Sequence, residues 1–165
     1  MRSNAPNTDS GGRRQILRFG AILLASLLFA STFSISGKLA AAGMPVVRLT
    51  AGVHIVQAEL AADQLSRMEG LMHRTSLGQN NGRLFVFDEA QIHCMWMKNT
   101  LIPLSVAFLD DKGAILNIAQ MEPQSERTHC AARPASYALE MNRGWFESRG
   151  IRAGTLIRGI PQVNP

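Results

Sequence analysis

The sequence has little of what marks most enzymes. Its 165 residues contain no glycine-rich phosphate loop and no nucleophile, base and orienting acid at a recognisable spacing. The adjacent acids Asp110 and Asp111 fit a solvated turn better than general acid catalysis. The sequence therefore favours a non-catalytic protein, and it predicts no cofactor.

Cysteine is also scarce, because only Cys94 and Cys130 are present. Their spacing is unlike the paired Cys-x-x-Cys of thiolate metal sites, which leaves such a site as the weaker alternative. In an oxidising compartment two such residues usually pair. Closing a loop of this length would stabilise the fold by roughly 3 to 4 kcal/mol. We predict a disulfide between Cys94 and Cys130.

Excess positive charge is missing from most of the chain. The net charge is +5, but five of the basic residues lie in residues 1–42. Residues 43–165 hold 12 basic against 11 acidic residues. Binding to nucleic acid needs Lys or Arg clustered against phosphates, so the sequence predicts no nucleic-acid partner.

Residues 1–42 are typical of a signal peptide. The uncharged run at residues 19–37 follows an arginine-rich segment, and the small residues Ala40 and Ala42 fit a cleavage site. We expect cleavage after Ala42 and export to the periplasm or cell envelope. The alternative is an uncleaved anchor, because the run approaches the ~20 residues that span a bilayer. The pair Arg13-Arg14 is also similar to a twin-arginine signal.

The remaining chain is predicted to be rich in short strands. Apolar patterning predicts a strand or bent hairpin over residues 46–58 with a kink at Gly52, and strands over 84–87, 92–98, 104–109, 114–121, 136–142 and 155–160. The strands over 104–109 and 114–121 are expected to form a hairpin. A short helix is predicted over residues 61–71 and a helical turn over 145–149. Turns are predicted at 78–82 and 110–113, and a long loop at 121–134. These elements indicate an α+β domain with a mainly antiparallel sheet that could close into a small barrel or roll.

Four blocks of sequence together form a recognisable signature. They are Arg67-x-x-Gly70-Leu71-Met72-x-Arg74-x-x-Leu77, Gly82-x-Leu84-x-x-Phe87, Trp96-Met97-Lys98-Asn99-Thr100-x-Ile102-Pro103-Leu104 and Leu139-Glu140-x-Asn142-x-Gly144-Trp145-Phe146. The blocks resemble the family called domain of unknown function 192, over roughly residues 47–160. The resemblance implies a widespread prokaryotic domain, often exported, with no established activity. Residues 43–165 are accordingly expected to form one compact domain.

The sequence departs from this family at three positions. Arg83 stands where the family usually has Met, Met95 where it usually has Phe, and Ser105 where Asp is common. If that acidic position served a reaction in the family, Ser105 would weaken an enzymatic interpretation of this chain.

Lys98 and Asn99 are the leading candidates for ligand binding. A charged residue beside Trp96 and ahead of a rigid Ile-Pro turn is not required for packing. Residues predicted to join them are Arg67, Arg74, Glu140 and Asn142. In the alternative interpretation, Lys98 pairs with Glu140 and the Asn99 side chain caps the turn. Glu140 is also the carboxylate whose apolar strand would raise its pKa.

Methionine and histidine suggest a copper hypothesis, since both suit copper ions in an exported protein. The candidates are Met68, Met72, His73, His93, Met95, Met97, Met121 and His129. Most of the methionines occupy positions expected in a core, and no compact cluster exists beyond Met95-x-Met97. No metal site is therefore predicted.

Three functional hypotheses follow from the sequence. The first is a non-catalytic envelope domain that binds a small molecule, a glycan or an envelope protein, with membrane contact only through an uncleaved leader. The second is an uncharacterised envelope hydrolase or transferase that uses the same polar residues. The third is a copper-handling protein.

The leader gives the first testable prediction. N-terminal sequencing of the protein recovered from its own envelope fraction should begin at Gly43, because the peptidase is expected to cut after Ala42. A mature protein that begins at Met1 or Arg2 would contradict cleavage and favour the anchor.

Overall fold

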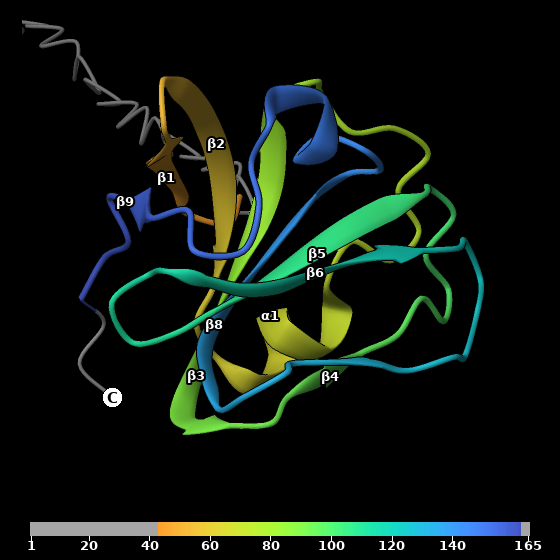
Figure 1. Ribbon diagram of the computed structural model, residues 1–165. Coiled ribbons are helices and arrows are strands. Elements are labelled where there is room, and N and C mark those ends of the chain that lie inside the picture. The colour runs from red at the N-terminus through yellow and green to blue at the C-terminus, as the bar shows by residue number, and fades with distance from the viewer. Residues whose placement is uncertain (1–42, 163–165) are drawn as a thin grey trace, which may run out of the picture. The chain divides into compact units, whose positions relative to one another are not determined.

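A computed structural model describes residues 43–162 of the protein (Figure 1). The expected leader lies outside the described residues, so its cleavage stays a prediction. The described elements are β1 (Val46–Ala51), β2 (His54–Ala61), α1 (Gln64–Glu69), β3 (Asn81–Gln91), β4 (Cys94–Met95), β5 (Leu104–Leu109), β6 (Ile115–Met121), β7 (His129–Cys130), β8 (Ala135–Asn142), the 3₁₀ turn η1 (Glu147–Arg149) and β9 (Ile157–Arg158). None of the helices within residues 43–162 is long and apolar enough to span a membrane.

Seven strands form one mixed sheet in the order β6-β5-β8-β3-β2-β1-β9, and β4 pairs only with β7. All neighbours in the large sheet are antiparallel except β2 and β3, which run parallel. A parallel pair needs a long crossover, which residues 62–80 supply through α1. The prediction of a mainly antiparallel α+β sheet is therefore matched only in part, because the sheet is mixed and helix is sparse.

The large sheet curls into a half-barrel (Figure 1). Its two ends meet where the β5–β6 turn contacts the segment before β9. The amide of Ile115 donates to the carbonyl of Thr155 at 2.9 Å, and the amide of Ile157 donates to the carbonyl of Gly113 at 2.9 Å. These hydrogen bonds join the two ends of the curled sheet, although β6 and β9 do not pair along their length.

Local sequence signals predicted several elements correctly. The hairpin β1–β2 turns at Gly52, whose φ is 59°, and the hairpin β5–β6 turns at Gly113, whose φ is 83°. In the second turn the Asp110 carboxylate accepts from the amides of Lys112 and Ala114. The 3₁₀ turn η1 ends at Gly150 as expected.

The predicted strand over residues 92–98 is wrong in most of its length. Only Cys94 and Met95 are extended, because the amide of Met97 donates to the carbonyl of Ser125 and Asn99 adopts a φ of 58°. The predicted helix over 61–71 is shortened to six residues, since Asp63 caps it in a reciprocal hydrogen-bond pair with Ser66. The predicted turn at 78–82 ends earlier, because β3 begins at Asn81.

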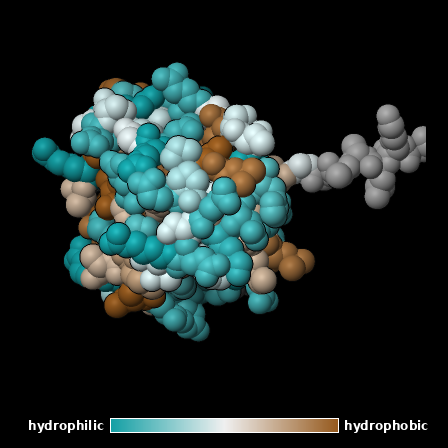
Figure 2. Space-filling model, turned by 90° about the vertical axis from the view of Figure 1, so that its right-hand side faces the viewer, coloured by the Kyte–Doolittle hydropathy of each residue, from teal (hydrophilic) through white to brown (hydrophobic). Residues whose placement is uncertain are grey.

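The two faces of the sheet bury separate apolar clusters. Leu84 and Leu139 lie in one cluster, while Phe85 and Ala138 lie in the other together with Leu71 from the segment after α1. Figure 1 shows α1 and β4 on the same side of the sheet, and Figure 2 shows hydrophobic side chains in small patches among hydrophilic ones on the face it displays. The face beneath α1 and β4 is the one that carries the candidate site.

Closure of the half-barrel can be tested at two glycines. A Cβ at Gly113 would lie 2.6 Å from the carbonyl oxygen of Ile157, while a Cβ at Gly154 would meet nothing within 4 Å. Both have nearly the same φ, 83° and 84°. Gly154→Ala should lower the free energy of unfolding by about 1 to 2 kcal/mol through backbone strain alone. Gly113→Ala should lower it by roughly 1 kcal/mol or more beyond that, because its Cβ would also meet the Ile157 carbonyl. Urea unfolding measures both, and equal losses would show that the contact does not hold the curl.

Candidate functional site

A row of charged side chains crosses three neighbouring strands on the face beneath α1. The register places Glu59 of β2 opposite Arg83 of β3, and Arg83 opposite Glu140 of β8. Arg83 is fully buried, and its Nη2 donates to Oε2 of Glu59 at 2.6 Å. Arg74 donates to the same oxygen at 2.6 Å. One carboxylate on β2 therefore binds two guanidinium groups.

Glu59 is ionised in this arrangement. Its partial burial works to raise its pKa, but the hydrogen bonds from Arg83 and Arg74 outweigh that and hold the pKa below its usual range. Arg83 is not fully satisfied in return, because its Nε and Nη1 have no hydrogen-bond partner within the described residues.

Glu140 is the unusual member of the row. Only 3% of it is exposed, and burial raises the pKa of its carboxyl group to about 8, an effect that the charge of Arg83 offsets only in part. No hydrogen bond contributes to this shift. The carboxyl group is therefore mostly protonated at neutral pH and free to bind a group that approaches it.

Glu140 lines a cavity of about 640 Å³ that we name the β3–β4 pocket. The pocket is enclosed by α1 and the turn after it, by β3, and by the segment that contains β4. Its apolar lining consists of Met68, Leu71, Met72, Phe85, Phe87, Met95 and Trp96. Its polar lining includes Gln64, Arg67, Glu69, Asp88, Glu89, Gln91, His93, Thr100 and Glu140.

Arg67 fixes α1 over the end of β3. Its guanidinium donates to the carbonyls of Ala62 and Val86 and forms a two-pronged pair with Asp88, the shorter contact being 2.7 Å. Only 18% of the side chain is exposed. The donors of Arg67 are therefore committed to the protein, and its contribution to the pocket is mainly structural.

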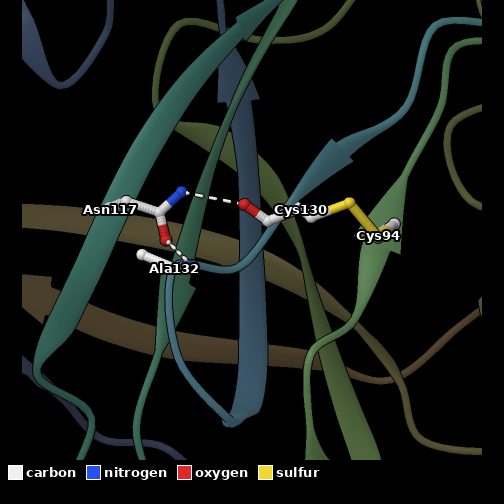
Figure 3. The surroundings of a disulfide bond; sticks show 4 residues. All are labelled: Cys94, Asn117, Cys130 and Ala132. Carbon is white, nitrogen blue, oxygen red and sulfur yellow. Dashed lines mark hydrogen bonds between the residues drawn. A yellow bond between two sulfur atoms is a disulfide. The ribbon is translucent and has the colours of Figure 1, made fainter.

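The wall opposite α1 is tied down by the predicted disulfide, which the structure confirms between Cys94 of β4 and Cys130 of β7 (Figure 3). The Asn117 side chain on β6 donates to the carbonyl of Cys130 and accepts from the amide of Ala132. Since Cys94 itself lines the pocket, the disulfide and Asn117 connect this wall to the sheet.

His93 is also held in place. Its ring stacks on Phe87 with centroids 3.6 Å apart, and its Nε2 donates to the carbonyl of Glu89 at 2.9 Å. Within residues 43–162 no group of three or more His, Cys, Asp or Glu side chains could hold a metal ion. Met68, Met72 and Met95 nevertheless line the same pocket, so the copper hypothesis keeps these residues as its candidates.

The structure brings only two of the six predicted ligand-binding residues, Arg67 and Glu140, into the pocket. Arg74 lies on Glu59, and Asn142 donates to the carbonyls of Leu77 and Gly78. These two side chains stabilise strand and loop contacts.

The other two lie just outside the pocket. The predicted pair between Lys98 and Glu140 is wrong, because Lys98 lies 3.6 Å from Glu126 and 5.4 Å from the centroid of the Trp96 ring. The Asn99 carbonyl accepts from the amide of His73. Both residues therefore support the wall that carries Trp96 and do not face Glu140.

The sequence treated Arg83 only as a departure from a family pattern and missed its place in the charged row. The signal available in the sequence was a lone charge in the run Gly82-Arg83-Leu84-Phe85. The structure buries all four of these residues. A charge within a buried strand requires a partner on an adjacent strand.

The model of the family DUF192, described as "Uncharacterized ACR", matches residues 46–159. This chain is a member of the DUF192 family. The resemblance seen in the sequence is thereby confirmed, and the description of the family names no activity. A search of curated proteins found no match for this DUF192 chain.

Two solved structures resemble this DUF192 domain. A protein of Sinorhizobium meliloti 1021, described as a "putative transcription regulator", is 36% identical, with a TM-score of 0.65 over 69% of this chain and 92% of its own. A protein of unknown function from Novosphingobium aromaticivorans DSM 12444 is 32% identical, with a TM-score of 0.68 over 72% of this chain and 88% of its own.

The raised pKa of Glu140 predicts how stability depends on pH. In the folded protein the pKa of Glu140 is about 8, above its unfolded value of 4.5. The neutral carboxyl group therefore contributes fully to stability below pH 4.5, and this contribution is lost as the pH rises through 8. The difference in unfolding free energy between wild type and Glu140→Gln should fall by at most about 1.4 kcal/mol per pH unit across that window. Urea titrations from pH 5 to 9 measure it, and a flat difference would contradict a raised pKa.

The charged row predicts that two substitutions around one ion pair have unequal effects. Glu59→Gln leaves the buried charge of Arg83 without its carboxylate partner at 2.6 Å. The free energy of unfolding should fall by roughly 3 kcal/mol. This is the low end for a broken buried pair, because 22% of the Glu59 side chain is exposed. Arg83→Met removes two unpartnered buried nitrogens and leaves Glu59 paired with Arg74 at 2.6 Å, so no charge is left without a partner and the change should be neutral or stabilising. Chemical denaturation compares them, and equal costs would mean that Arg83 itself stabilises the fold.

Proposed function

We propose that this DUF192 protein is an exported, non-catalytic binding domain of the cell envelope that takes a small, mainly apolar ligand in the β3–β4 pocket. The observation that carries the proposal is the pocket itself. Its volume of about 640 Å³ lies within the range of roughly 300 to 1,000 Å³ that is usual for ligand sites. Apolar side chains with a few polar groups are the usual lining of such sites.

The chemistry of the lining favours a small apolar molecule over a glycan. Phe85, Phe87 and Trp96 offer ring surface, and three methionines offer flexible apolar surface that adapts to irregular shapes. Glu140 supplies one polar group at a buried point of the wall, which would fix the orientation of a bound molecule.

Two features support export. The leader has the order of a signal peptide, and the pocket wall depends on the disulfide between Cys94 and Cys130, which persists in oxidising compartments. Nucleic acid is not the proposed partner, since residues 43–165 carry nearly balanced charge. The leader is the only segment proposed to contact a membrane, and only if it is not cleaved.

A second candidate is an envelope hydrolase or transferase. It is favoured by Glu140, because a carboxyl group that stays protonated near neutral pH is what general acid catalysis needs. Ser105 does not assist it: its hydroxyl accepts from the amide of Gly144 and it lines a separate cavity of about 340 Å³. Thr100 is the residue with an alcohol group among those lining the β3–β4 pocket, and its hydroxyl donates to the Lys98 carbonyl at 3.5 Å, not to a base.

The proposal is tested with the neutral dye N-phenyl-1-naphthylamine and a matched pair of variants. Met68 and Leu65 lie on α1 and are 65% and 78% exposed, but only Met68 lines the pocket. Met68→Arg should weaken dye binding at least tenfold, because it places a charge at the pocket wall, whereas Leu65→Arg should leave it unchanged. Fluorescence titration of the disulfide-intact protein measures both.

Failure of the dye to bind wild type, or equal binding by both variants, would contradict a ligand site in this pocket. Native mass spectrometry of protein from its own envelope fraction complements this test. A bound organic mass supports the proposal, and a bound copper ion would favour the copper hypothesis.

A further inference from the structure

The charges around the β3–β4 pocket are unbalanced towards negative. Apart from Glu140, which is mostly neutral near pH 7, its acidic lining residues are Glu69, Asp88 and Glu89, against the single basic residue Arg67. Arg67 is already paired with Asp88 at 2.7 Å. Glu69 and Glu89 are exposed at the rim and face no cation in the described ion pairs, so the mouth of the pocket attracts positive charge.

The aromatic side chains of the pocket suit the same kind of ligand. Phe85, Phe87 and Trp96 line it together with three methionines, and the faces of aromatic rings attract cations. The Trp96 ring already holds one, since Nζ of Lys98 lies 5.4 Å from its centroid. An apolar lining with acidic groups is complementary to an ammonium group carried on a hydrocarbon body.

Glu140 gives such an ammonium group a partner inside the pocket. Glu140 lines the cavity, and its carboxyl group takes part in none of the ion pairs within residues 43–162. The rival cation is Arg83 on β3, but its Nη2 is held by Glu59 and Arg83 does not line the pocket. A bound ammonium would therefore meet Glu140 without displacing an existing pair.

From these contacts we infer that the ligand of the β3–β4 pocket is a primary amine on an apolar body, bound as its ammonium ion against Glu140. The inference rests on the proposed binding function and names its ligand class. Binding transfers one proton from the neutral Glu140 carboxyl group to solvent, so that a carboxylate and an ammonium form the pair.

This proton balance gives the pH dependence its sign. Because Glu140 is neutral in the free protein below about pH 8, affinity for an amine rises with pH up to that value, by roughly tenfold per unit. Arg83 on β3 is the charged group that acts on Glu140, with Glu59 bound to Arg83 and Arg74 bound to Glu59. The other titratable residues of the pocket lining are Arg67, Glu69, Asp88, Glu89 and His93.

The experiment compares three probes of one shape: 4-phenylbutylamine, 4-phenylbutanol and 4-phenylbutyrate. Each displaces N-phenyl-1-naphthylamine from the wild-type protein at pH 6, 7 and 8. The amine should bind at least tenfold more tightly than the alcohol at pH 8, and its advantage should grow with pH. The carboxylate should bind most weakly, because Glu69 and Glu89 repel it.

Glu140→Gln supplies the decisive variant. It should still bind the neutral dye, which shows that the pocket is intact, but lose the advantage of the amine and its pH dependence. Glu126→Gln is the matched control, since Glu126 is exposed, lies outside the pocket and contacts Lys98; it should leave amine binding unchanged.

The outcomes separate the two proposals. Equal binding of amine and alcohol to a protein that binds the dye would overturn the amine inference and leave the binding function standing. A preference for the alcohol that weakens as pH rises through 8 would also overturn it, because the neutral Glu140 would then be acting as a hydrogen-bond donor. Failure of the dye and all three probes to bind would contradict both proposals.

Discussion

The burial of Arg83 in the middle of the sheet is the constraint on which the site depends. A fully buried guanidinium needs a carboxylate, and Glu59 on the neighbouring parallel strand provides it at 2.6 Å. With Arg83 engaged there, Glu140 on the other side is left buried beside a positive charge that it does not bind. The unusual ionisation of Glu140 is thus a consequence of how three strands are ordered.

That strand order also builds the pocket over Glu140. The parallel pairing of β2 with β3 requires the crossover through α1, and Arg67 then holds α1 against β3. The opposite wall is the segment around β4, which the disulfide and Asn117 attach to β7 and β6. Each wall is therefore fixed through a few of its own lining residues, Arg67 with Asp88 on one side and Cys94 on the other.

Sequence reasoning succeeded where the determining contacts are local. Asp110 and Gly113 predict the β5–β6 hairpin because a turn is decided by its own residues. It failed for residues 92–98, where a hydrogen bond from Met97 to the distant Ser125 replaces strand pairing. It also missed the Glu59–Arg83 pair, because the register that sets Glu59 opposite Arg83 joins two strands that are far apart in the sequence. Glu140 was identified because a lone carboxyl on an apolar strand is visible from the sequence, although its true neighbour is Arg83 and not Lys98.

The proposed binding chemistry depends on Glu140 keeping its proton near neutral pH inside the pocket. The most direct measurement is a carbon-13 NMR titration of the glutamate side-chain carboxyl carbons in the ligand-free protein, with the Glu140 signal assigned by its loss in Glu140→Gln. The expected midpoint for Glu140 is near 8, while the Glu59 carboxyl should titrate below its usual range. A Glu140 midpoint close to the ordinary value of 4.5 would show that the carboxyl group is ionised at neutral pH, and solvated or paired in the pocket.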